Sequence, residues 1–348
     1  MKVSCPHCKN QAPLLFTSKD YNQEITQDTF YYYRCSSCKL IFIFPIPTNL
    51  SSYYISTYPA YQIPKLKDLD SVAEKERYKI EILQQHITKG RLLEIGPSYG
   101  GFAYLAQKSG FEVEAIEMNS SCCKFLTEVV KITAINTQNV STALQGLRPY
   151  NVIVLWHVIE HLVSPWEILE VISDKLLPNG ILVLAAPNPS ALQFRIFKQF
   201  WVHVDAPRHL QLIPVQLLIN QMESLGLTTV SVTTTDKASA IFSNFNWWKI
   251  SFDNFFKEHL SSDKNEFRVS SEKLKRKKNN KTTWFSSKLL SFFSKRPQFF
   301  LKLKDYFVVI IFRLIFWVLL KPIENLEGQA SAYTVIFRKK ENLNSARH

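Results

Sequence analysis

The middle of the chain alternates between two hydrophobic patterns. Short segments rich in apolar residues are separated by segments in which apolar residues recur with helical spacing. The apolar segments lie at 91–96, 111–118, 133–136, 151–157 and 181–187, and the helical ones at 102–109, 121–130 and 165–176. Apolar strands that alternate with helices are typical of a parallel sheet buried on both faces. The pattern therefore predicts an α/β fold with a doubly wound, mostly parallel sheet.

The pattern continues to the C-terminus. Residues 214–226 predict a helix, and residues 227–235 and 331–339 predict two further strands, which brings the sheet to seven strands. A long block, 236–328, separates these last two strands.

Two short signals predict element boundaries. Ser120 is the candidate N-cap of the helix at 121–130. The sequence "LLPNG", 176–180, is typical of a turn that precedes the strand at 181–187.

The chain divides into five predicted parts. A module of residues 1–45 contains four cysteines, and residues 46–88 form a Tyr- and Pro-rich connector that leads into a charged helix. The core of the sheet occupies 89–235, an aromatic and basic helical insert occupies 236–328, and the last strand with its tail occupies 329–348.

Four of the six cysteines form two CxxC pairs near the N-terminus, Cys5 with Cys8 and Cys35 with Cys38. Four thiolates in two such pairs are typical of a structural, tetrahedral Zn²⁺ site, which has no open position for catalysis. Because so short a module builds little hydrophobic core, we expect the metal to supply much of its folding energy. A redox dithiol and a coincidental spacing are the alternatives.

The positive charge is concentrated in one segment. The whole chain carries a net charge of +13. From Lys264 to Lys304 there are 13 Lys and Arg against Glu266 and Glu272, so 13 − 2 = +11. This distribution predicts one local basic surface, and it argues against a fold that binds nucleic acid over its whole surface. The first ten residues contain no apolar segment of a secretory signal, so we expect a cytoplasmic protein.

The stretch "LLEIGPSYGGF", Leu92–Phe102, joins the first core strand to a helix. Its glycines allow the backbone to approach a ligand closely. A dinucleotide fingerprint starting at Gly96 would need glycine at position 98, where Ser98 stands, so binding of NAD is disfavoured. Glu117 ends the next strand, 21 residues after Gly96, where a carboxylate can accept both hydroxyls of a ribose. The loop therefore predicts a nucleotide cradle of another kind.

Five ordered pieces of the sequence resemble the class I S-adenosylmethionine (SAM)-dependent methyltransferases. They are "EIGPSYGGF", "AIEMN", "YNVIVLWHVIEHLVSPWEIL", "LLPNGILVLAAPNPS" and "HVDAPRHLQLIPVQLL". The last piece is similar to a segment of the branch related to quinone and cell-surface methyltransferases. The resemblance implies a Rossmann-like methyltransferase fold with SAM as the methyl donor. Ser98 and Asn151 depart from the glycine and aspartate that are frequent in the family.

The resemblance also implies which residues bind the cofactor. They are Glu94, Gly96, Pro97, Gly100, Glu117 and Met118. In the family, the acidic residue on the first strand and the two glycines hold the methionine part of SAM, and the acidic end of the second strand holds the ribose. The alternative is a glycine turn that binds no ligand.

Two polar clusters follow the fourth and fifth strands, at the strand ends where open α/β sheets bind ligands. The first contains His157, Glu160 and His161, whose spacing can gather them on one face of a turn. In the ubiquinone-type O-methyltransferases, which this stretch resembles, the matching segment has Glu in place of His157 and is a divalent-metal site. A catalytic role, metal binding and simple stabilisation of the loop therefore stay open as alternatives.

The second cluster is "HVDAPRHL", with His203, Asp205, Arg208 and His209. His209 is the candidate general base because imidazole titrates near neutral pH. Asp205 or Arg208 can orient this base or the substrate. Alternatively, an Arg–Asp pair holds a lid loop.

The insert contains "FNWWKISFDNFF", the basic run "EKLKRKKNNK" and the apolar stretch Tyr306–Leu320. The last has 15 residues interrupted by Arg313, short of the ~20 that span a bilayer. A single crossing would also place two strands of one sheet on opposite sides of a membrane. We therefore expect peripheral contact with an anionic membrane surface. A helical cap, a dimer interface and a solvated linker are the alternatives.

The sequence thus predicts a SAM-dependent methyltransferase with an N-terminal zinc ribbon, located at the inner face of the membrane. The expected acceptor is an oxygen on a lipid-linked, quinone-like or cell-envelope glycan molecule. A soluble sugar nucleotide as acceptor and a non-catalytic SAM-binding adaptor are the alternatives. Methylation of nucleic acid is a further alternative, since zinc ribbons and basic runs also suit RNA. It is disfavoured, because the Asn-Pro-Pro-aromatic motif of amino-group DNA methylation is absent. The sequence makes no prediction of the oligomeric state.

Overall fold

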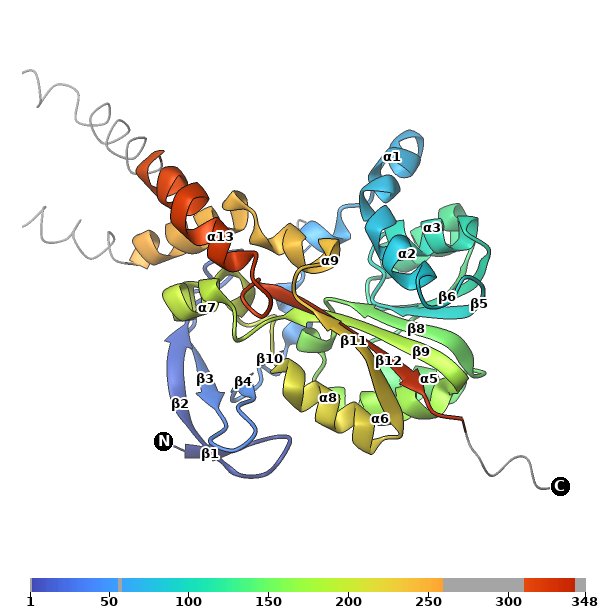
Figure 1. Ribbon diagram of the computed structural model, residues 1–348, viewed down its shortest axis with the longest axis horizontal. Coiled ribbons are helices and arrows are strands. Elements are labelled where there is room, and N and C mark those ends of the chain that lie inside the picture. The colour runs from blue at the N-terminus through green and yellow to red at the C-terminus, as the bar shows by residue number, and fades with distance from the viewer. Residues whose placement is uncertain (1, 56–57, 259–309, 342–348) are drawn as a thin grey trace, which may run out of the picture.

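The computed structural model describes residues 2–55, 58–258 and 310–341. Within these residues, seven strands form one sheet in the order β11–β12–β9–β8–β5–β6–β7 (Figure 1). The strands are β5 (Gly90–Ile95), β6 (Phe111–Glu117), β7 (Thr133–Asn136), β8 (Tyr150–Trp156), β9 (Leu176–Pro187), β11 (Leu227–Thr233) and β12 (Ala332–Lys339). β5 to β9 run parallel, whereas β12 is antiparallel to both β9 and β11.

Helices cover both faces of this sheet (Figure 1). One face packs against α5, α6 and α8, and the other against α1, α2 and α3. The helix bounds are α1 (Leu69–Ala73), α2 (Arg77–Gln84), α3 (Gly101–Lys108), α4 (Ser120–Phe125), α5 (Val140–Gln145), α6 (Pro165–Lys175), α7 (Leu192–Phe197), α8 (Val215–Ser224) and α9 (Lys237–Ala240). Central strands are buried on both sides, which explains the uninterrupted apolar sequence of Val152–Leu155. The predicted doubly wound, mostly parallel α/β fold is confirmed.

Three local features differ from the sequence prediction. The N-cap of α4 is Asn119 and not Ser120, because the chain turns into the helix one residue earlier and the Asn119 side chain accepts from the Cys122 N–H at 3.0 Å. The expected turn at 176–180 is the irregular start of β9, with Asn179 in the left-handed region at φ +62°. The sequence pattern also missed α5, a helix of six residues.

The N-terminal module contributes most of a second, antiparallel sheet. In the described part of the chain its order is β1–β2–β3–β4–β10. The bounds are β1 (Lys2–Ser4), β2 (Gln11–Ser18), β3 (Phe30–Arg34), β4 (Ile41–Ile43) and β10 (Gln211–Leu212). β10 comes from the segment between β9 and β11 of the large sheet and pairs with β4. The N-terminal module is therefore joined to the rest of the protein by strand pairing, which also covers its sheet edge.

The four cysteines of the two CxxC pairs lie together. Cys5 Sγ is 3.7 Å from Cys38 Sγ, and Cys8 Sγ is 3.4 Å from Cys35 Sγ. All four sulfur atoms lie within 4.8 Å of one another. Zn–S bonds of about 2.3 Å in a tetrahedron separate sulfur atoms by about 3.8 Å. The cluster is compatible with the predicted zinc ribbon.

After α9, the described parts of the insert contain two longer helices that pack together. One covers 245–258, and the other covers 310–324, including the π-helical turn η10 (Phe316–Leu320) and α13 (Lys321–Glu324). The rings of Phe252 and Phe312 stack at 4.2 Å between them. The basic run between Lys264 and Lys304 lies outside the described residues. None of the helices in 2–55, 58–258 and 310–341 is long and apolar enough to cross a membrane.

The cysteine cluster generates the first prediction. The purified chain should contain about one Zn²⁺, measured by elemental mass spectrometry, and Cys5→Ser or Cys38→Ser should lose it, because three thiolates hold the ion less tightly than four. Cys122→Ser, in α4 and outside the cluster, should keep the metal. A wild-type protein that holds no zinc and has four freely titrating N-terminal thiols would contradict the zinc ribbon.

Candidate functional site

A cavity of about 1020 Å³ opens at the carboxyl ends of β5, β6 and β8. This is the edge of an open α/β sheet at which ligands bind. Its volume reaches the upper end of the range for sites of single small ligands, about 300–1,000 Å³. The space runs without interruption from the glycine loop to the histidines that follow β8. It can therefore hold a cofactor and an acceptor side by side.

The glycine loop at the end of β5 has a left-handed backbone that leaves no room for a Cβ atom at Gly96. Gly96 has φ +70°, and a Cβ there would lie 2.6 Å from Val158 Cγ2. Gly100, at φ +82°, is the N-cap of α3 and does not itself line the cavity. Ser98, which replaces a frequent glycine of the family, has φ +59° and so tolerates the left-handed conformation that the turn needs.

Two buried carboxyl groups border this loop. Glu117, at the end of β6, accepts from the Ser98 N–H at 2.9 Å and from the Asn119 N–H at 2.7 Å, which fixes its position. Glu94 on β5 is 3% exposed, and its Oε2 has no hydrogen-bond partner in the described structure. Burial raises the pKa of Glu94 to about 8, against the opposing effect of the Lys79 ammonium. An unpaired, buried carboxyl that faces a cavity favours a cationic ligand group.

The loop after β8 carries a third buried carboxylate. Glu160 is 1% exposed, and neither of its oxygens has a hydrogen-bond partner among the described residues. His157 Nδ1 lies 3.8 Å from Glu160 Oε1, which is an ion-pair contact and longer than a hydrogen bond. Although burial opposes ionisation, the neighbouring imidazoles of His157, His161 and His209 lower the pKa of Glu160 to about 2. His157 itself has φ +57°, a strained conformation of the kind found at functional sites.

Backbone carbonyls orient two of these histidines. His209 Nδ1 lies 2.7 Å from the His203 carbonyl oxygen, and His161 Nδ1 lies 3.1 Å from the Arg208 carbonyl oxygen. Because a carbonyl can only accept, the His209 contact favours the tautomer that carries the proton on Nδ1 and leaves Nε2 as an acceptor. His161 Nδ1 also lies 3.0 Å from the Tyr54 hydroxyl, which can accept or donate. Burial lowers the pKa of His161 to about 4, so this ring is neutral at pH 7.

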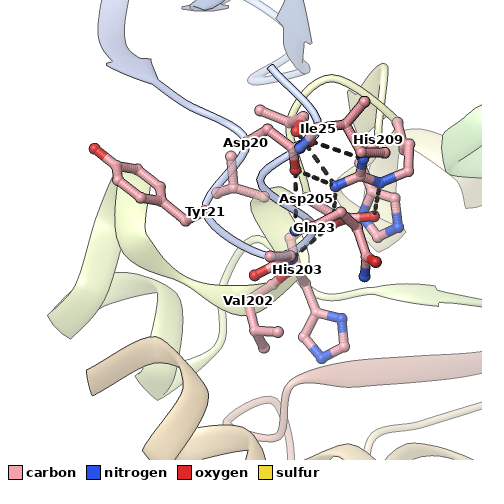
Figure 2. Close-up of polar contacts among 12 residues, drawn as sticks. Asp20, Tyr21, Gln23, Ile25, Val202, His203, Asp205 and His209 are labelled. Carbon is pink, nitrogen blue, oxygen red and sulfur yellow. Dashed lines mark hydrogen bonds and ion pairs between the residues drawn. The ribbon is translucent and has the colours of Figure 1, made fainter. Parts of the chain in front are cut away.

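A buried ionic network holds the loop that carries His203 and His209 (Figure 2). Arg208 is fully buried and donates to Asp20 at 2.6 Å and to Asp205 at 2.8 and 2.9 Å. Although burial opposes ionisation of Asp205, the Arg208 guanidinium lowers its pKa to about 2. Asp20 belongs to the N-terminal module and also accepts from two backbone N–H groups of its own turn. The Arg208 side chain is thus engaged within the protein, as the lid-loop alternative anticipated.

Parts of the chain that the sequence analysis did not assign to the site also line the cavity. They are Asn22 and Gln23 of the N-terminal module, Tyr54, Tyr58 and Tyr61 of the connector, and Phe242, Trp247 and Ile250 of the insert. The Ser98 hydroxyl donates to the Ala60 carbonyl, which ties the connector to the glycine loop. The density of tyrosine in the connector was the available sequence signal.

The structure brings most of the expected site residues together. Lining this cavity are Glu94, Gly96, Pro97, Glu117, Met118, His157, Glu160, His161, His203, Asp205 and His209. Arg208 and Gly100 lie behind its wall. The roles of these residues in binding and catalysis stay predictions.

The Arg208 network generates the second prediction. Arg208→Met leaves Asp20 and Asp205 buried without a cation and should lower the free energy of unfolding by about 3–5 kcal/mol. Asp20→Asn leaves the neutral Arg208–Asp205 pair in place and should cost less. Denaturant titration of the full chain measures both, with Asp28→Asn, exposed in the same module, as a control near zero. Equal stability of Arg208→Met and wild type would show that the network does not hold the loop.

Comparison with known proteins agrees with this geometry. Residues 72–232 match the family model described as a methyltransferase domain. No curated protein sequence matches the chain significantly. A SAM-dependent methyltransferase from Archaeoglobus fulgidus has a similar structure, with a TM-score of 0.46 and 16% identity over 77% of this chain and 94% of that one.

Two other similar structures give lower scores. A SAM-dependent methyltransferase from Mesorhizobium loti has a TM-score of 0.39 and 14% identity, over 51% of this chain and 92% of that one. The [4+2]-cyclase SpnF has a TM-score of 0.42 and 10% identity, over 76% and 82% of the two chains. The family match, together with the strand order of the sheet, shows that this chain carries a class I SAM-dependent methyltransferase domain.

Proposed function

We propose that the protein transfers the methyl group of SAM to a hydroxyl oxygen of an uncharged acceptor that contains a ring. The observation that carries this proposal is the Glu160 carboxylate, buried without a hydrogen-bond donor among imidazoles in the cavity of the SAM cradle. A lipid-linked, quinone-like or cell-envelope glycan molecule is the expected acceptor class.

The cofactor end of the cavity suits SAM. The unpaired Oε2 of Glu94 can accept from the ammonium of the methionine part. Glu117 uses one lone pair of each oxygen on backbone N–H groups and retains others for the ribose hydroxyls. Gly96, at φ +70°, lines the cavity and allows the backbone to approach the ligand.

The acceptor end can remove a proton as the methyl group moves. The acceptor oxygen forms the new bond to the methyl carbon, the carbon–sulfur bond breaks, and the sulfur keeps the electron pair. The acceptor O–H proton passes to Nε2 of His209, whose Nδ1 proton is held by the His203 carbonyl. The Glu160 carboxylate then stabilises the imidazolium that forms, because the two side chains offer atoms within 4.8 Å of each other.

The charges around the cavity favour an uncharged acceptor. Among the described residues that line the cavity, Lys79 is the single residue with a Lys or Arg side chain, and its ammonium pairs with Glu76 at 2.6 Å. Acidic side chains are more numerous there, and Tyr54, Tyr58 and Trp247 add aromatic surface. A soluble sugar nucleotide would bring a diphosphate to a wall without a free cationic side chain. It is therefore the less favoured acceptor.

A divalent metal is the alternative way to activate the acceptor oxygen. Glu160, His161 and His209 each place one ligating atom within 4.8 Å of the others, and this donor set fits a divalent ion. His157, named in the sequence-based alternative, is not part of this group. These three side chains would hold the ion, which would act on the acceptor oxygen as a Lewis acid.

The raised pKa of Glu94 generates the third prediction. Below pH 8 the free protein must lose the Glu94 proton before the carboxylate binds the ammonium of SAM, so the Kd should rise about tenfold per unit between pH 8 and pH 6. Glu94→Gln should bind weakly and lose this slope. Glu114→Gln, which removes the partner of Arg91 outside the cavity, should keep it. Calorimetry in two buffers measures both Kd and proton release, and a pH-independent wild-type Kd would contradict this role.

The histidine cluster generates the fourth prediction. Glu160→Gln and His209→Gln should lower the rate of methyl transfer by about 10²–10⁴-fold, because proton removal is lost, while SAM affinity is retained. His86→Gln, after α2 and outside the cavity, is the matched control. The assay uses methyl-labelled SAM with separated lipid and aqueous extracts of the source cells.

Each outcome of that assay separates the alternatives. Label in the lipid extract supports the proposal, and label confined to the aqueous extract favours the sugar nucleotide. SAM binding without transfer to either extract favours the non-catalytic adaptor. The protein could also contain a stoichiometric divalent ion outside the cysteine cluster. If removal of this ion abolished methyl transfer, the metal and not His209 would activate the acceptor oxygen.

A further inference from the structure

The helix at 310–324 exposes apolar side chains over most of its circumference. Phe316 and Glu324 are buried against the protein, and Glu324 accepts from the Trp248 indole at 2.6 Å and from Gln193 at 2.8 Å. Phe312 and Leu320 are half-buried beside them, whereas seven other apolar side chains point outward with exposed fractions of 41–68%. They are Ile311, Leu314, Ile315, Trp317, Val318, Leu319 and Ile323, called here the apolar face.

Such a surface is unusual for a helix that contacts only water. A surface helix normally places polar residues opposite its buried stripe, and contiguous exposed apolar patches mark binding surfaces. Here Arg313 is the one charged residue between Ile310 and Leu320. In Figure 1 this helix and the one at 245–258 extend side by side from the body of the protein. The apolar face therefore requires a partner that can bury it.

The surrounding charge indicates an anionic partner. Arg313 and Lys321 lie within the span of the apolar face, and neither forms an ion pair with an acid in the described part of the chain. The Arg313 guanidinium lies over the Phe245 ring at 5.6 Å, and Lys321 Nζ donates to the Ser243 carbonyl at 2.8 Å. The sequence 259–309, which leads directly into this helix, contains 13 Lys and Arg against four Asp and Glu, so 13 − 4 = +9. Apolar residues combined with a basic flank are typical of helices that lie in the plane of an anionic lipid surface.

The packing of the helix selects this orientation. Its described residues, 310–324, extend about 22 Å against the ~30 Å hydrocarbon core of a bilayer. The helix also contacts the methyltransferase domain through Phe316 and Glu324, so it cannot leave the protein to cross a membrane. It can lie at the surface with the apolar face buried among the lipids.

We propose that the apolar face of the helix at 310–324 inserts into the surface of an anionic bilayer. The helix at 245–258 stacks on it through Phe252 and Phe312, and the same helix lines the cavity with Trp247 and Ile250. The acceptor side of the cavity is therefore one helix away from the lipid. Membrane docking does not depend on the proposed acceptor, but it would bring a lipid-linked one to the cavity.

The test is flotation of the full chain with vesicles. The wild type should float with vesicles of about 30% phosphatidylglycerol in phosphatidylcholine, and much less with phosphatidylcholine alone. The double variant Leu314→Glu, Val318→Glu should lose at least tenfold in bound fraction. Both side chains are more than 60% exposed, so the fold should be kept. Leu66→Glu, 70% exposed in the connector, is the matched control and should float as the wild type does.

Insertion can be separated from electrostatic attachment. Brominated lipids should quench part of the tryptophan fluorescence of the wild type and less of that of Trp317→Phe, because Trp317 belongs to the apolar face. Raising the salt concentration should weaken binding only in part, since the apolar contribution is not screened.

Three results would overturn the proposal. The wild type would not float, or the Leu314→Glu, Val318→Glu variant would float as well as the wild type, which would assign binding to the basic segment alone. In the third result, the variant has a lower melting temperature than the wild type, or a lower mass by light scattering. The first difference would show that another part of this chain covers the apolar face, and the second that a second copy does. SAM binding by calorimetry, measured on the same samples, distinguishes these failures from a failure of the methyltransferase assignment.

Discussion

The buried pair of Arg208 and Asp20 connects the two halves of the protein. Arg208 comes from the loop that carries His203 and His209, and Asp20 comes from the N-terminal module, 188 positions away in the sequence. With Asp205, the network contains two carboxylates and one guanidinium. Burying such groups is costly unless they stay paired, so displacement of either half would leave uncompensated charge. The position of the proposed base therefore depends on the correct folding of the N-terminal module.

This coupling gives the N-terminal module a structural role inside the site. Its sheet continues through β4 into β10 of the methyltransferase half, and its residue Asn22 donates both to Asp205 and to the Val202 carbonyl. Tyr32 contributes a further contact, since its hydroxyl donates to the carbonyls of Val204 and His209. A module held in this way forms part of the cavity wall and is not arranged as a separate domain on a linker.

The sequence predicted those features of the fold and of the candidate site that a local sequence pattern can encode. Gly96 and Glu117 were recognisable because a turn and a strand end each impose a residue type, and the parallel sheet followed from its apolar strands. The pairing of Asp20 with Arg208 could not be predicted, because no local sequence signal joins positions so far apart. β10 was missed because two residues carry no periodicity, and Asn119 replaced Ser120 as a cap because boundaries depend on tertiary context.

Hydrogen exchange of the full chain, with zinc bound and after its removal, tests most directly the claim that the N-terminal module holds the proposed catalytic loop. The account predicts that residues 203–212 lose protection together with β2 and β3 when zinc is removed, while β5 and β8 keep theirs. Unchanged protection of residues 203–212 in a chain whose N-terminal module has become unprotected would contradict it.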